Sequence, residues 1–220
     1  MTYLEELIKI LDSAGGKEVI VVCDFDGTLT SAKSDVTMNA MAKYFGYDSD
    51  FAKERTALYG QYGKYLAPSD DAERYKALNK WWSAQMQLFK KYNVAPEAYS
   101  DAAAKLDFEL HDGTYELLSY CEKQDIPVFV VSCGLGNIII PILAMSGLLS
   151  MNMRVIANFI RYDGDAPISY TPVVTPANKA AHLTLELEEF ENYYALVIGN
   201  KQEDITLLPE DISTGILVKD

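Results

Sequence analysis

Three short runs of the chain are almost continuously apolar, and each ends in small or polar residues. They span residues 19–23, 127–131 and 194–198. Such runs are typical of strands in a sheet that is buried on both faces. Helix-like patterns separate them, at residues 113–123, 135–145 and 178–191. The alternation predicts an α/β fold: a three-layer α/β/α, Rossmann-like core with a parallel sheet and helices on both faces.

Weaker patterns extend this core at both ends. Leu4, Leu7, Ile8 and Leu11 predict an amphipathic helix over residues 2–13. A closing strand is expected near residues 216–218. Residues 153–162 and 168–170 are expected to form short strands or a hairpin around Asp163-Gly164.

The segment between the first two strands has a different pattern, with many aromatic residues and no convincing strand. A stripe at three- and four-residue steps predicts a helix whose apolar face packs within this insert: Tyr75, Leu78, Trp82, Met86 and Phe89. Four aromatic residues lie off that stripe and are better candidates to face a ligand: Trp81, Tyr59, Tyr62 and Tyr65. We therefore expect a core made of residues 1–32 and 106–220, with a small all-helical insert at residues 33–105.

The first strand leads directly into two carboxylates, Asp24 and Asp26, followed by a Gly-Thr turn. Side chains two positions apart on a strand point to the same side, so both acids are expected to reach one spot. Two adjacent acids repel, and a cation between them relieves the repulsion. Asp24 has the chemistry of a carboxylate nucleophile that accepts a phosphoryl group, and Asp26 is placed to act as general acid and base.

Other candidate groups follow the later strands, and ligands of such sheets bind beyond the carboxyl ends of the strands. The loop Ser132, Cys133 and Gly134 opens a helix and is suited to hold a phosphate. Lys179, near the start of a helix, would neutralise that phosphate. Asn200 and Asp204 are oxygen donors suited to Mg²⁺. Each segment taken alone is also compatible with an ordinary turn, a surface lysine or a capped loop.

Composition narrows the class of function. The net charge of -13 disfavours binding to nucleic acid polymers or to anionic membranes. Three cysteines without metal-ligand spacing, and no apolar leader, indicate a reduced, cytoplasmic protein. No Cys-x5-Arg loop follows Cys133, because residue 139 is Ile, so a cysteine nucleophile is not favoured.

The four elements Asp24-Phe25-Asp26-Gly27-Thr28, Ser132, Lys179 and Gly199-Asn200…Asp204 stand in order along nearly the whole chain. In this order they resemble the haloacid dehalogenase superfamily of Mg²⁺-dependent phosphatases, and the helical insert resembles its C1-type cap. Shorter matches resemble the cytosolic pyrimidine 5'-nucleotidase branch: Trp81-Trp82, Ile126-Pro127-Val128-Phe129 before Ser132-x-Gly-x-Gly136, Asn158-Phe159, and Asn178-Lys179.

The resemblance implies roles for these residues. Asp24 would attack phosphorus, and Asp26 would protonate the leaving alcohol and then activate water. Ser132 and Lys179 would hold the phosphate. The cofactor would be Mg²⁺, with Asp24, the Asp26 carbonyl, and Asn200 and Asp204 of the last motif as ligands.

Two positions depart from the family pattern. Asn200 stands where the family usually has Asp, which removes a negative charge from the metal site. Lys80 stands where the nucleotidases have an acid before the tryptophan pair.

The expected substrate is a small phosphomonoester, with a nucleoside 5'-monophosphate as the leading candidate because an aromatic-rich cap can stack a base. Two alternatives remain: a phosphoserine phosphatase-like enzyme with a small polar cap pocket, and a non-catalytic ligand-binding protein weakened by Asn200. The oligomeric state is left open.

Overall fold

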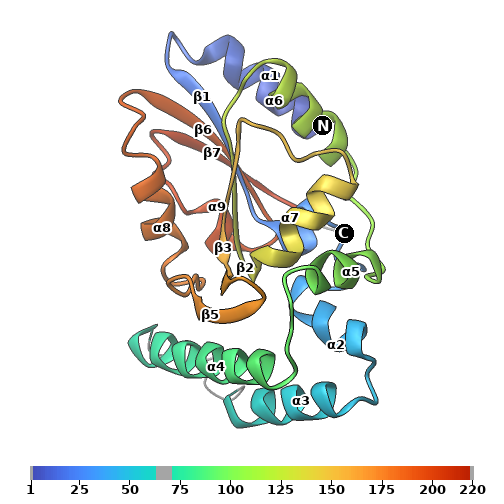
Figure 1. Cartoon of the computed structure of the whole chain (residues 1–220). Helices are drawn as coiled ribbons and strands as arrows, with labels where there is room; N and C mark the ends of the chain where they lie inside the picture. Colours follow the sequence, from blue (N-terminus) through green and yellow to red (C-terminus); the bar gives the residue numbers. More distant parts are fainter. Residues whose placement is uncertain (1, 63–70, 219–220) are drawn as a thin grey trace.

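A parallel five-stranded sheet forms the centre of the computed structural model, which describes residues 2–62 and 71–218 (Figure 1). The strand order is β3-β2-β1-β6-β7, and every neighbouring pair is parallel. The strands are β1 (Glu18–Cys23), β2 (Val128–Leu135), β3 (Met153–Asn158), β6 (Tyr193–Gly199) and β7 (Ser213–Leu217). The α/β fold class and the parallel sheet expected from the sequence are confirmed.

Helices cover both faces of the sheet because the side chains of each strand alternate between them. Val19, Val21 and Cys23 of β1 pack into the larger apolar cluster, together with α1, α6 and α7. Ile20 and Val22 pack into a second cluster with α8. These helices are α1 (Tyr3–Ser13), α6 (Thr114–Lys123), α7 (Gly136–Met145) and α8 (Lys179–Glu186).

Some local expectations change in the structure. Residues 153–158 join the main sheet as its edge strand, and only β4 (Ile160–Asp163) and β5 (Ala166–Tyr170) form a hairpin around Asp163-Gly164. Helix α8 ends at Glu186 and not at residue 191, and Phe190 turns back to meet the Phe129 ring at 5.8 Å. In α1 the buried residues are Tyr3, Leu7 and Ile10, so Ile8 is 40% exposed.

Between β1 and α6 the described chain consists mainly of helices joined by short loops, and we call residues 37–62 and 71–104 the helical segment. It contains η2 (Thr37–Asn39), α2 (Ala40–Phe45), α3 (Asp50–Tyr62), α4 (Asp71–Lys91) and α5 (Ala98–Ala104). Figure 1 shows α3 and α4 beyond the end of the sheet that lies opposite α1. The hairpin touches α4, where the Tyr170 hydroxyl donates to the Asn79 carbonyl at 3.3 Å and the Tyr170 and Trp82 rings lie 6.4 Å apart.

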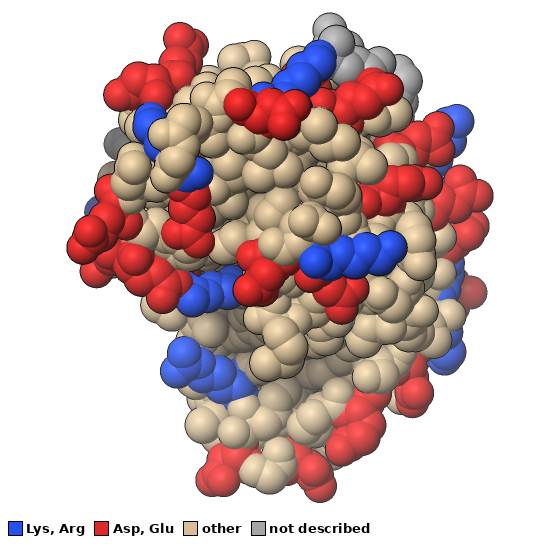
Figure 2. All heavy atoms as spheres, turned by 90° about the horizontal axis from the view of Figure 1, so that it is seen from above, with Lys and Arg blue, Asp and Glu red and all other residues tan. Residues whose placement is uncertain are grey.

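Acidic side chains are prominent on the end of the molecule away from the helical segment, with fewer basic ones among them (Figure 2). This agrees with the excess of 32 Asp and Glu over 19 Lys and Arg in the chain. Among the helices of the described residues, none combines the length and the apolar character needed to cross a membrane.

Asn158, at the end of β3, connects the end of β2 with the chain before α8 and is 1% exposed. Its amide nitrogen donates to the carbonyls of Cys133 at 2.9 Å and Val174 at 3.1 Å, and its oxygen accepts from the Val174 N–H at 2.8 Å. These bonds hold the chain before α8 against the end of β2.

We predict that Asn158→Ala lowers the free energy of unfolding by about 2–4 kcal/mol, because three buried backbone groups lose their partner. Denaturant unfolding followed by circular dichroism measures this. Asn192→Ala is the matched control at an exposed position, where a change within about 0.5 kcal/mol is expected. A loss for Asn158→Ala no larger than that of the control would contradict the prediction.

Candidate active site

A tight turn, and not the strand itself, brings the two acids to one place. Strand β1 ends at Cys23, so Asp24 is the first residue beyond it and Asp26 lies inside the turn η1 (Phe25–Leu29). Gly27 has a φ of 79°, in the left-handed region that favours glycine. A Cβ atom at Gly27 would also collide with the Asn200 side chain. The expected strand alternation is therefore replaced by a turn that requires glycine.

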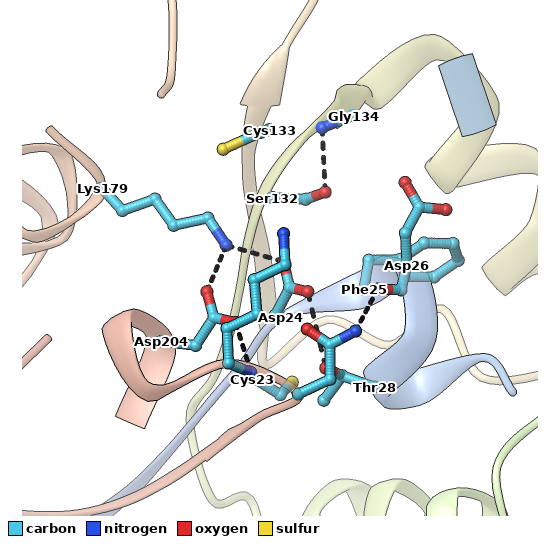
Figure 3. A network of polar contacts seen from close by, with 12 residues as sticks. Cys23, Asp24, Phe25, Asp26, Thr28, Ser132, Cys133, Gly134, Lys179 and Asp204 are labelled. Carbon is cyan, nitrogen blue, oxygen red and sulfur yellow. Dashed lines mark hydrogen bonds and ion pairs between the residues drawn. The ribbon is translucent and has the colours of Figure 1, made fainter. Parts of the chain in front are cut away.

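Lys179 connects two acids that lie far apart in the sequence. Its Nζ donates to Asp24 Oδ1 and to Asp204 Oδ1, both at 2.7 Å (Figure 3). All three residues are buried, with Lys179 only 4% exposed. Burial by itself would lower the pKa of Lys179, but the neighbouring Asp24 and Asp204 raise it above the ordinary value. Lys179 is therefore a fixed positive charge beside the candidate nucleophile.

Asp26 is held by a residue of the helical segment. The Thr37 N–H donates to Asp26 Oδ1 at 2.9 Å, and the Thr37 hydroxyl donates to Oδ2 at 2.6 Å. Burial raises the pKa of Asp26 from 3.8 to about 6, although both Thr37 hydrogen bonds oppose the rise. A carboxyl group with this pKa can give up and take back a proton near neutral pH, as general acid–base chemistry requires.

The last residues of β2 face the Asp26 carboxylate. Figure 3 shows Asp26 on the side of Ser132 and Gly134, while Asp24 faces Lys179. A Cβ atom at Gly134 would lie 2.9 Å from Asp26 Oδ2 and 3.1 Å from Ser132 Oγ, so both oxygens border the space above this glycine. The Gly134 N–H donates to Ser132 Oγ at 3.0 Å. Burial raises the pKa of the Cys133 thiol to about 12, which keeps it protonated.

Together these groups line a cavity of about 170 Å³. The residues expected from the sequence that border it are Asp24, Asp26, Ser132, Cys133, Gly134, Lys179 and Asp204. Of the expected metal ligands, Asp204 already accepts hydrogen bonds at both oxygens, from Lys179 and from the Lys201 N–H at 3.2 Å. Its geometry is that of a residue that positions the lysine.

Asn200 provides the test of whether Mg²⁺ suits this chain. Its amide nitrogen donates to the Asp26 carbonyl at 3.2 Å, while its Oδ1 atom is buried and has no hydrogen-bond partner within the described residues. A buried oxygen without a donor is a suitable ligand for a hard cation, as are the Asp24 carboxylate and the Asp26 carbonyl. Among residues 2–62 and 71–218 no cluster of three or more His, Cys, Asp or Glu has metal-site geometry, so the donor set depends on this amide.

A second, larger cavity of about 530 Å³ adjoins the first and is covered by α3 and α4. The two cavities share Met38, Cys133 and Pro176 as wall residues. Trp81 and Tyr59, expected to face a ligand, both line the larger one. Trp82 and Leu78, expected to pack within the insert, reach its wall as well.

The two other aromatic residues expected to face a ligand, Tyr62 and Tyr65, are not found in the described wall of the larger cavity. Tyr62 is half-buried against the main apolar cluster, and it is not among the described residues that line the larger cavity. Tyr65 lies outside the residues that the structure describes.

Several residues at or beside these cavities carry no functional signal in the sequence. Thr37 and Lys201 border the acids, and Arg55 lines the larger cavity. Arg55 stands in the charged stretch Lys53-Glu54-Arg55, which is typical of a solvated helix face. No spacing or composition marks Thr37, because its role depends on where the helical segment meets the core.

The fold and the carboxylate turn define the haloacid dehalogenase class of α/β proteins. Within that class, a family model described as "Pyrimidine 5'-nucleotidase (UMPH-1)" matches residues 27–212, beginning directly after the acid pair. The chain belongs to this family.

Relatives and solved structures agree with this assignment. A 7-methylguanosine phosphate-specific 5'-nucleotidase of Drosophila melanogaster is 26% identical over 88% of the chain, and the match spans 63% of that protein. The protein of the same name from Gallus gallus is 20% identical over 91% of the chain and 74% of its own length. The chain thus spans less than two thirds of the first of these relatives.

Among solved structures, cytosolic 5'-nucleotidase IIIB bound to cytidine has a similar fold. Its TM-score is 0.69, with 21% identity, over 96% of this chain and 75% of that one. A phosphoserine phosphatase described as a phospho-aspartyl intermediate analogue has a TM-score of 0.51 at 18% identity, over 87% of this chain and 81% of that one. At these identities the likeness concerns the fold.

The raised pKa of Asp26 predicts a pH-dependent difference between the wild type and Asp26→Asn. The folded protein binds this proton more tightly than the unfolded chain, so wild-type stability falls as pH rises from about 4 through about 6. Asp26→Asn has no such proton to lose. Its free energy of unfolding relative to the wild type should therefore rise by roughly 1–3 kcal/mol between pH 4 and pH 8. Denaturant unfolding in the presence of chelator at the two pH values measures the gap. An equal difference in stability at pH 4 and pH 8 would contradict the raised pKa of Asp26.

Proposed function

We propose that this protein hydrolyses the phosphomonoester of a small metabolite, most favourably a nucleoside 5'-monophosphate, with Asp24 as the phosphoryl-accepting nucleophile. The observation that carries the proposal is the buried arrangement in which Lys179 is bonded to Asp24 while Asp26 borders the same cavity. The insert at residues 33–105, which contains the helical segment, would serve as a cap that receives the leaving group.

In the first step an Asp24 oxygen attacks phosphorus. The bond from phosphorus to the substrate oxygen breaks, and protonated Asp26 gives its proton to that oxygen, so that the alcohol departs. The product is a phosphoryl group joined to Asp24.

In the second step water attacks the same phosphorus and Asp26, now a carboxylate, takes its proton. The bond between phosphorus and Asp24 breaks, and inorganic phosphate leaves. Lys179 and Ser132 stabilise the negative charge of the phosphoryl oxygens through both steps.

These oxygen donors suit Mg²⁺, which Asp24, the Asp26 carbonyl and the unpartnered Asn200 Oδ1 would hold. When bound, it would neutralise part of the phosphoryl charge. Thr37 is an additional positioning residue, because both of its donors hold the carboxyl group of Asp26.

The larger cavity favours a flat leaving group. Trp81, Trp82 and Tyr59 line it, and its volume of about 530 Å³ exceeds that expected for a small polar cap pocket. Aromatic walls bind planar rings by stacking or edge contacts. This observation favours the nucleotidase proposal over a phosphoserine phosphatase-like one.

The nucleophile is tested with Asp24→Asn. We predict that the variant loses at least about 10³-fold of the phosphate release from UMP with Mg²⁺ present, since an amide cannot accept the phosphoryl group. Phosphate release in a malachite-green assay gives the rate. The control Asp165→Asn, at an exposed position, should retain the wild-type rate. Failure of the wild type to release phosphate from UMP, CMP, phosphoserine or ribose 5-phosphate would support the non-catalytic alternative.

The metal site is tested with Asn200→Asp. A carboxylate there adds one negative charge beside Asp24, so we predict that the Mg²⁺ dissociation constant falls by roughly tenfold or more. Calorimetric titration of Mg²⁺ into both proteins measures this without depending on turnover. Unchanged or weaker affinity would place the metal away from Asn200.

A further inference from the structure

Two arginines line the larger cavity, although the chain as a whole is acidic. Arg55 of α3 and Arg74 of α4 both line it, and no Asp or Glu is among its lining residues within the part of the chain that is described. The rest of the molecule carries the excess of acid that Figure 2 shows on the far end. An arginine in a cavity wall favours ligands that bring negative charge.

Arg55 of the larger cavity has no acidic partner among the described residues. It is half-buried, and one of its guanidinium nitrogens donates to the neutral Met38 carbonyl. Within residues 2–62 and 71–218 no ion pair joins Arg55 to a carboxylate. Burial lowers the pKa of this guanidinium below its ordinary value. A partly desolvated cation in this state gains most from a ligand that brings negative charge.

Trp81 provides a second, independent sign of a missing acceptor. It lines the same cavity and is 6% exposed, and its Nε1–H is buried without a hydrogen-bond partner in the described structure. An indole N–H can only donate, so the group that satisfies it must be an acceptor. An electron-rich ligand atom could therefore accept hydrogen bonds from both Arg55 and Trp81.

We propose that Arg55 is a specificity-determining residue that selects phosphomonoesters whose planar leaving group carries an anionic group, and that this cavity disfavours cationic rings. The planar part lies against the aromatic wall, and the anionic group meets Arg55 and the Trp81 N–H. Lys80 has no part in this selection, since it is exposed and is not among the described lining residues. The inference rests on the proposed function, because it assumes that the cavity receives the leaving group.

The test uses three nucleotides that form a charge series on the base: 7-methylguanosine 5'-monophosphate, with a cationic methylated ring; UMP, with a neutral ring; and orotidine 5'-monophosphate, which is UMP with a ring carboxylate. In the wild type, kcat/KM is expected to rise along the series by about tenfold for each step in charge. Each rate is divided by that for ribose 5-phosphate in the same variant, which separates charge selection from damage to the phosphoryl chemistry.

Variants at Arg55 then test the residue itself. Arg55→Gln should compress the spread across the series to within about threefold, Arg55→Lys should retain most of it, and Arg55→Glu should invert it. Arg154→Gln is the matched control, because that arginine lies on β3 and pairs with Glu186 and Glu189 at the surface. It should leave the spread unchanged.

Two results would overturn the inference: a wild-type preference for the cationic nucleotide, or a spread that persists in Arg55→Gln. A merely structural role would alter all three substrates alike. If no phosphomonoester is hydrolysed, the proposed function fails separately. Calorimetric binding of the same three nucleotides to the wild type then decides the charge preference, with the same order expected.

Discussion

The ion pairs of Lys179 are the interaction on which the rest of the site depends. One ammonium group, 4% exposed, joins Asp24 at the end of β1 to Asp204 near the start of α9 (Gln202–Ile205). Removing Lys179 would leave two buried carboxylates without a counter-charge, which is far more costly than losing an exposed ion pair. The loop before α8 is accordingly fixed on both sides: by Asn158, which binds the backbone of Val174, and by Asn178, which binds the Val173 carbonyl at 2.8 Å.

The charges of this cluster also give a physical reason for an amide, and not an acid, at position 200. Asp24 and Asp204 share one lysine, and burial keeps the pKa of Asp26 near 6. A further acid at position 200 would face the same buried group of carboxylates and raise their repulsion when no cation is present. An amide lowers that repulsion but still offers an oxygen. An amide at this position favours the stability of the metal-free fold, whereas an acid would favour stronger metal binding.

The sequence was sufficient for the central strands of the sheet, but not for β3, whose residues were expected in short strands or a hairpin. Apolar runs locate β1, β2 and β6, and strands of one parallel sheet must end at the same edge, so Asp24, Ser132 and Asn200 had to be neighbours. It could not show that Asp24 and Asp26 are brought together by a turn, because that depends on where β1 stops. It also could not find Thr37 or Arg55. Their importance arises from the docking of the helical segment, which involves contacts between residues with no shared periodicity.

That docking links the two cavities. Thr37 belongs to the helical segment and Asp26 to the core, so the two hydrogen bonds that hold the Asp26 carboxyl exist only while the segment is in place. The next residue, Met38, lines both cavities, and its carbonyl accepts from Arg55. A leaving group that draws Arg55 toward itself therefore acts on the same short stretch that positions the acid. Under the proposed function, recognition in the larger cavity and proton transfer in the smaller one would both depend on two consecutive residues, Thr37 and Met38.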